Sequence, residues 1–89
     1  MEKNQLRLCL DREVERWRGK PYETLASELA SSVNYECGEG RSAYQTEVIL
    51  LEDTPEYVHV MVGVSDGGWR SFVPLTTTFL VYRDGRPSS

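Results

Sequence analysis

The chain has 89 residues, enough for one small domain and too few for two, since globular domains commonly run to about 100–150 residues. Its 14 acidic and 10 basic residues give a formal charge of −4, which disfavours nucleic acid and anionic membranes as partners. With 39% apolar and 27% charged residues the chain is expected to fold, and no apolar run reaches the roughly 20 residues of a membrane helix.

The N-terminal residues and the two cysteines bear on the cellular compartment. Residues 1–10 lack the apolar stretch of a secretory signal peptide. Cys9 and Cys37 form no Cys-x-x-Cys pair, and two isolated cysteines are typical of reduced thiols in the cytoplasm. We therefore expect a cytoplasmic protein without an internal disulfide.

Helical spacing predicts two helices in the first third of the chain. The first runs over about 4–18 and carries an apolar stripe at steps of four, four and three residues: Leu6, Leu10, Val14 and Trp17. On its opposite face, Arg7 and Asp11 are one turn apart and are expected to form an ion pair. Gly19 and Pro21 interrupt this pattern, and a second helix is expected over about 21–31.

Alternation and β-branched residues predict four strands in the remaining chain, over about 43–52, 57–65, 69–73 and 77–83, before a polar tail at 84–89. Residues 34–42 indicate a short strand or a loop, because two glycines interrupt them. The apolar run at 48–51 indicates that the first strand is central and covered on both faces at that end. In the last strand, Phe79 and Val81 fall on one face and Leu80 and Tyr82 on the other.

A tight turn is expected after the second strand, in which valines occupy the even-numbered positions from 58 to 64. The Asp66-Gly67-Gly68 sequence suits a two-residue hairpin, because these residues tolerate positive φ. Such a hairpin would pair Val64 with Trp69 or Ser71. Helices followed by strands with short connections then predict a single α+β domain over residues 1–89. In it, two N-terminal helices pack on an antiparallel four-stranded β-meander as a two-layer sandwich.

Two residues are candidates for catalysis, Cys37 as a nucleophile and His59 as its base, since such a pair needs to meet only in space. The structural alternative is a small apolar cysteine at a strand edge and a partly exposed histidine on the sheet. We expect no cofactor and no metal, because one histidine without clustered cysteines supplies no ligand set.

Trp69 and Arg70, together with Tyr57, are candidates for binding, because aromatic residues and arginine are enriched at protein interfaces. The structural alternative places Trp69 in the core, since a small domain needs its large apolar area inside.

The Asp66-Gly67-Gly68-Trp69-Arg70 sequence, followed by Phe72 and Pro74-Leu75, resembles the signature of a family of small bacterial proteins, a domain of unknown function. The resemblance covers residues 44 to about 82 and extends to Gly19-Lys20-Pro21-Tyr22. It implies a bacterial protein and supplies no catalytic residue.

A noncatalytic binding or interaction module is the function expected by default, because the sequence shows no catalytic constellation. Two alternatives stay open, a small thiol-dependent hydrolase or transferase using Cys37 and His59, and an antitoxin-like or immunity-like inhibitor favoured by the acidic charge. A homodimer is expected, formed through a sheet edge or through apolar positions that two short helices leave uncovered.

Overall fold

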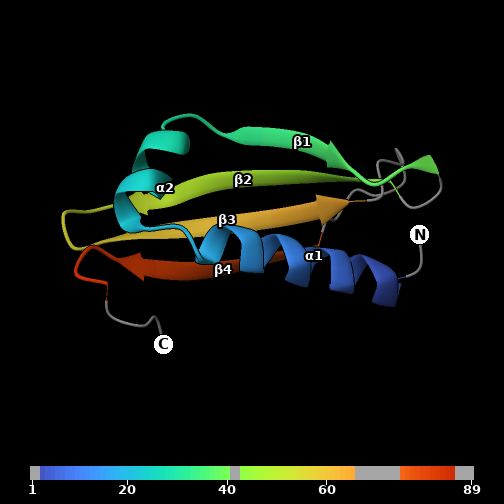
Figure 1. Cartoon of the computed structure of the whole chain (residues 1–89), viewed down its shortest axis with the longest axis horizontal. Coiled ribbons are helices and arrows are strands. Elements are labelled where there is room, and N and C mark those ends of the chain that lie inside the picture. The colour runs from blue at the N-terminus through green and yellow to red at the C-terminus, as the bar shows by residue number, and fades with distance from the viewer. Residues whose placement is uncertain (1–2, 41–42, 66–74, 86–89) are drawn as a thin grey trace.

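The structure, a computed structural model, describes residues 3–40, 43–65 and 75–85 of the chain. Two helices, α1 (Lys3–Arg18) and α2 (Tyr22–Glu28), precede four strands, β1 (Val33–Cys37), β2 (Tyr44–Asp53), β3 (Tyr57–Ser65) and β4 (Leu75–Tyr82). The strands form one antiparallel sheet in the order β1-β2-β3-β4, so each pairs with its neighbour in sequence (Figure 1). The predicted α+β class with an antiparallel four-stranded meander is therefore confirmed.

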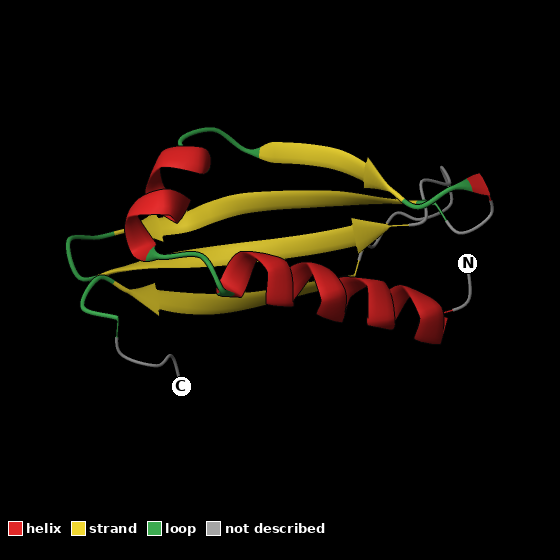
Figure 2. Ribbon diagram, viewed as in Figure 1, coloured by secondary structure: helices red, strands yellow, loops and turns green. Residues whose placement is uncertain are grey.

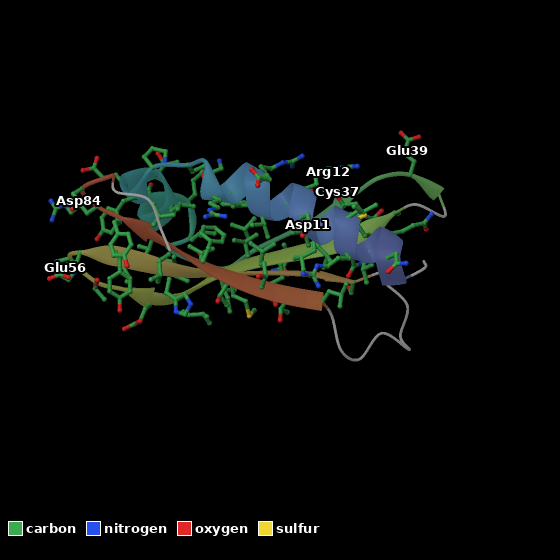
Figure 3. All side chains as sticks on the ribbon, turned by 90° about the horizontal axis from the view of Figure 1, so that it is seen from below. Asp11, Arg12, Cys37, Glu39, Glu56 and Asp84 are labelled. Atoms are coloured by element: carbon green, nitrogen blue, oxygen red, sulfur yellow. The ribbon has the colours of Figure 1, made fainter. Side chains whose placement is uncertain are left out.

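Both helices lie over the same face of the sheet (Figure 2). Helix α1 crosses β3 and β4, and α2 lies near the turn that joins β2 to β3 (Figure 1). Seen along the sheet, the helices stand on one side only, and side chains of the strands project from the other (Figure 3). Neither helix in the described part of the chain is long and apolar enough to cross a membrane.

The core lies between the helices and the sheet. Its buried apolar residues come from the helices and their connection as well as from the strands: Leu10, Trp17, Leu25, Leu29, Tyr44, Val48, Val58, Val60, Val62, Val64 and Phe79. The even-numbered valines of β3 thus face the helices, and Phe79 and Val81 face them from β4, as the alternation predicted. Burying each such side chain contributes about 1.5–3 kcal/mol, so this valine face holds the helical layer on the sheet.

The first helix agrees with its prediction, and the second is shorter. Arg7 Nε lies 3.7 Å from Asp11 Oδ1, which confirms the expected ion pair on the exposed face of α1. Helix α2 ends at Glu28, with Leu29 as its C-cap, and does not reach residue 31. Ser31 and Ser32 follow after two intervening residues, and serine side chains favour turns because they compete for the backbone hydrogen bonds of a helix.

The hairpin register predicted after β3 is wrong. Val64 lies opposite Thr46 of β2 on one side and Leu75 of β4 on the other, so neither Trp69 nor Ser71 is its partner. Pro74 lacks the backbone N–H that a paired strand residue donates. The segment after it, β4, pairs with eight residues of β3, more than the predicted strand of five residues at 69–73 could pair with. The predicted strand at 69–73 lies outside the described residues.

Two further differences concern the first half of the sheet. The segment read as a strand or a loop contains β1, which pairs along its whole length with β2. Strand β2 is central, as predicted, but it is not covered on both faces at its end, where Leu51 is 46% exposed. The helices cover one face only, and the register of β2 against β3 shifts between Leu50 and Glu52, so Leu51 is the extra residue of a β-bulge.

Candidate functional site

A carboxylate is buried between the helices and the sheet. Glu13 of α1 has no exposed surface. The hydroxyl of Tyr35, on β1, donates a hydrogen bond to Oε1 of Glu13, and the hydroxyl of Tyr44, on β2, donates to Oε2 at 2.8 Å. Arg16, one turn further along α1, brings Nη1 to 3.6 Å from Oε1. Both carboxylate oxygens are therefore satisfied, which removes most of the cost of burying this group.

Two more side chains extend the cluster around Glu13. The indole N–H of Trp17 donates to the hydroxyl of Tyr35 at 2.8 Å, so this hydroxyl both accepts and donates. The thiol of Cys37 lies 3.9 Å from Oε2 of Glu13, a distance typical of a weak S–H···O contact. We call this set of residues the Glu13 cluster: Glu13, Arg16, Trp17, Tyr35, Cys37 and Tyr44.

Burial and the carboxylate together shift the protonation of the cluster. Desolvation, and then the hydrogen bond to Glu13, raise the pKa of Tyr35 to about 12. Desolvation and the same carboxylate also raise the pKa of Tyr44. The negative charge of Glu13 raises the pKa of Arg16. Both phenols hold their protons near neutral pH, and their hydrogen bonds to Glu13 fasten α1 to β1 and β2.

A second polar group on the helix side of the sheet is left without a partner. Thr46 is 1% exposed, and its hydroxyl has no hydrogen bond within the part of the chain that the structure describes. We expect Thr46→Val to raise the free energy of unfolding by about 1 kcal/mol, because valine keeps the shape and removes the unpaired hydroxyl. Urea unfolding followed by circular dichroism measures the change. A loss of stability would show that the hydroxyl is hydrogen-bonded after all.

The opposite surface of the sheet, which we call the helix-free face, is partly apolar. Near the β2–β3 turn it carries half-buried large side chains from three strands: Ile49, Tyr57, His59, Met61, Leu80 and Tyr82. The rings of Tyr57 and Tyr82 lie 6.0 Å apart at an angle of 59°. Tyr57 also donates a hydrogen bond to Oε1 of Glu52 at 2.9 Å. No described helix or strand covers these side chains.

The two catalytic candidates lie on opposite faces of the sheet. Cys37 belongs to the Glu13 cluster on the helix side, beside α1 (Figure 3), whereas His59 lies on the helix-free face. They are also far apart along the sheet. Cys37 pairs with Tyr44 and His59 pairs with Glu52, and both of these partners lie on β2. Tyr44 and Glu52 are eight residues apart, which corresponds to about 26 Å along a strand. The structure therefore does not bring this thiol and this imidazole together.

Of the three binding candidates, only Tyr57 lies in the described part of the chain, on the helix-free face beside His59. Trp69 and Arg70 lie outside the described residues. Both cysteines are free thiols. Within residues 3–40, 43–65 and 75–85, no group of three or more His, Cys, Asp or Glu side chains is placed to hold a metal ion.

Sequence reasoning missed Glu13, although the signal for it was present. Leu10, Glu13 and Trp17 follow each other at steps of three and four, so Glu13 interrupts the apolar stripe of α1 with a charge. A carboxylate on a stripe that faces the core predicts buried donors on the neighbouring strands. The tyrosines that supply them, Tyr35 and Tyr44, give no such signal, because only the pairing of β1 with β2 brings them together.

Comparison with known proteins adds no relative from which a function could be transferred. The resemblance of the segment from Asp66 to Leu75 to small bacterial proteins accordingly stays a prediction. No family model, no curated protein and no solved structure matches this chain.

Proposed function

We propose that this chain is a noncatalytic interaction module, a two-layer α+β domain that binds a protein partner through its helix-free face. The observation that carries the proposal is the set of large side chains on a sheet face that no described element covers. Apolar and aromatic residues gathered on one open surface are typical of protein-binding sites, where tyrosine and methionine are enriched.

The proposal includes the bacterial cytoplasm as the compartment. Its support is the free state of both cysteines and the resemblance of residues 66–75 to small bacterial proteins. The net charge of −4 supports a protein partner over nucleic acid or an anionic membrane.

The thiol-enzyme alternative has less support. A cysteine nucleophile needs a base within about 3 Å, and His59 lies on the other side of the sheet from Cys37. The nearest carboxylate, Glu13, already accepts hydrogen bonds from two tyrosines and is fully buried. The helix-free face is open and has the residue types of an interface, so binding is the function that the geometry favours.

Weak self-association through this face is the expected result in the absence of a partner. The face measures about 30 Å by 15–20 Å, or about 500 Å², from the length of a nine-residue strand and the spacing of four strands. Stable interfaces bury about 800 Å² on each partner, so a second copy fits but binds weakly. We expect a dimer by light scattering at about 100 μM that dissociates at about 5 μM.

A matched pair of variants tests whether the helix-free face forms this dimer. Met61→Glu places a charge in the centre of the face and is expected to be monomeric at about 100 μM. Leu8→Glu changes a residue that is 66% exposed on α1, and it is expected to dimerise like the original chain. Circular dichroism verifies that both variants fold. The original chain remaining monomeric at about 100 μM would contradict dimerisation through the helix-free face. So would an equal loss of dimer in Met61→Glu and Leu8→Glu.

A further inference from the structure

The helix-free face has a hollow at the end opposite its apolar side chains. Gly63 of β3 lies between Glu47 of β2 and Thr76 of β4, and it has no side chain to fill the space above it. A hollow of about 200 Å³ opens there. A Cβ atom at Gly63 would lie 3.2 Å from Cγ2 of Thr76, so even an alanine would occupy the floor of this hollow.

Polar groups that accept hydrogen bonds dominate the lining of the hollow. Carboxylate, amide and hydroxyl oxygens come from all four strands: Asn34, Gln45, Glu47, Ser65 and Thr76. An adjoining hollow of about 270 Å³ shares Asn34 and Gln45 and adds Glu36. Neither Glu36 nor Glu47 has an ion-pair partner among the described residues.

The size of the hollow over Gly63 fits one side chain better than a free metabolite. Pockets for small molecules commonly hold about 300–1,000 Å³, and this one is smaller and open along the sheet. Met61 lines its inner end and also belongs to the apolar part of the face. The acceptor-rich hollow and the apolar side chains are therefore two ends of one continuous surface.

Within the described residues, charge is distributed unequally between the two sides of the sheet. The described arginines and lysines lie in α1 or the turn after it, apart from Arg83 at the end of β4. The helix-free face instead carries the carboxylates of Glu36, Glu47 and Glu52. A surface with unpaired carboxylates beside apolar side chains is complementary to a cationic and apolar partner.

We propose that the helix-free face docks a basic amphipathic segment of a partner protein. Apolar side chains of the segment cover Ile49, Met61 and Leu80, and an arginine or lysine enters the hollow over Gly63 and pairs with Glu47. The proposal rests on the function proposed above and adds the chemistry of the partner.

A second copy of the chain is the weaker occupant of the same face. Stacking two copies brings the carboxylates of both toward one interface, and like charges across an interface disfavour association. A basic segment meets those carboxylates with opposite charge instead. The dependence of binding on salt therefore distinguishes the two occupants. Added salt weakens binding of the basic segment, because it screens attraction between opposite charges, and favours the dimer, because it screens repulsion between like charges.

The test uses a fluorescent peptide of about nine residues, which spans about 30 Å when extended, the length of β3. Leucine and valine fill one half of the peptide and arginine alternates with serine in the other. A matched peptide carries citrulline for arginine, which keeps the shape and removes the charge. Fluorescence anisotropy with the full chain at about 5 μM, where dimers are dissociated, gives the two affinities. We expect the arginine peptide to bind about tenfold more tightly, and more weakly as salt increases.

Variants of the chain then locate the arginine. Glu47→Gln is expected to weaken the arginine peptide about fivefold and leave the citrulline peptide unchanged, whereas Glu15→Gln on the exposed side of α1 changes neither. Gly63→Ala occupies the floor of the hollow and is expected to weaken the arginine peptide more than the citrulline peptide. Should Gly63→Ala fold poorly, adding Thr76→Ser removes the methyl group that the new Cβ meets. Amide chemical shifts in β2 and β3 report binding at this face.

Each outcome decides between the two proposals. Equal binding of the arginine and citrulline peptides, or no effect of Glu47→Gln, would refute the cationic partner and leave the helix-free face as a docking surface. Binding that shifts only amides of α1 would refute both. A failure of both peptides to bind would refute the basic segment, and light scattering would then decide whether the face binds a second copy.

Discussion

Replacing Glu13 by alanine is expected to lower the free energy of unfolding by about 3–5 kcal/mol. The substitution removes the acceptor of two buried tyrosine hydroxyls and leaves a space in the core. A domain of this size has a free energy of unfolding of about 4–13 kcal/mol. A loss of about 3–5 kcal/mol would therefore remove a large part of the stability of the variant. Urea unfolding followed by far-ultraviolet circular dichroism measures the change.

Glu15→Ala is the matched control, because Glu15 is an exposed glutamate of the same helix. It is expected to change the stability by no more than about 0.5 kcal/mol. Tyr35→Phe and Tyr44→Phe each remove one donor and are expected to cost about 1–2 kcal/mol, less than the loss of the carboxylate they share. A loss for Glu13→Ala as small as that for Glu15→Ala would mean that the Glu13 cluster does not hold α1 on the sheet.

The domain is expected to lose stability steeply between pH 10 and pH 12. An unfolded tyrosine has a pKa of 10, and that of Tyr35 in the folded chain is about 12. Below pH 10 this phenol is protonated in both states, so its stabilising contribution is complete there. As the pH rises toward 12, the unfolded chain releases the proton and the folded chain retains it, so unfolding becomes more favourable. The raised pKa of Tyr44 acts in the same direction.

Unfolding midpoints in urea at pH 8, 9, 10 and 11 test this pH dependence. The double variant Tyr35→Phe, Tyr44→Phe retains all other titrating groups, so its midpoint is expected to fall less steeply above pH 10. Absorbance of the tyrosinate anion, recorded on the same samples, shows whether ionisation accompanies unfolding. Equal slopes for the double variant and the original chain would exclude the two phenols as the cause.

The hydrophobic periodicity alone determined most of the elements. The stripe through Leu10 and Trp17 indicated α1, and the alternating valines of β3 indicated both its extent and its buried face. Such patterns are local, because a helix or a strand with one buried face repeats its apolar residues at a fixed step. The end of α2 and the presence of β1 were less clear, because short segments with glycine and serine have weak local preferences.

Only the tertiary structure decided which side chains meet. The pairing of Val64 with Leu75 joins two strands that are separate in sequence, and the glycines after β3 predicted a different register. The pairing of β1 with β2 places Tyr35 and Tyr44 around Glu13, and the same sheet separates Cys37 from His59 on opposite faces. The sequence by itself determined the composition of each face through its alternation. The contacts between strands, and between strands and helices, depend on the register and on which face the helices cover. The local spacing of residues determines neither, so only the tertiary structure shows these contacts.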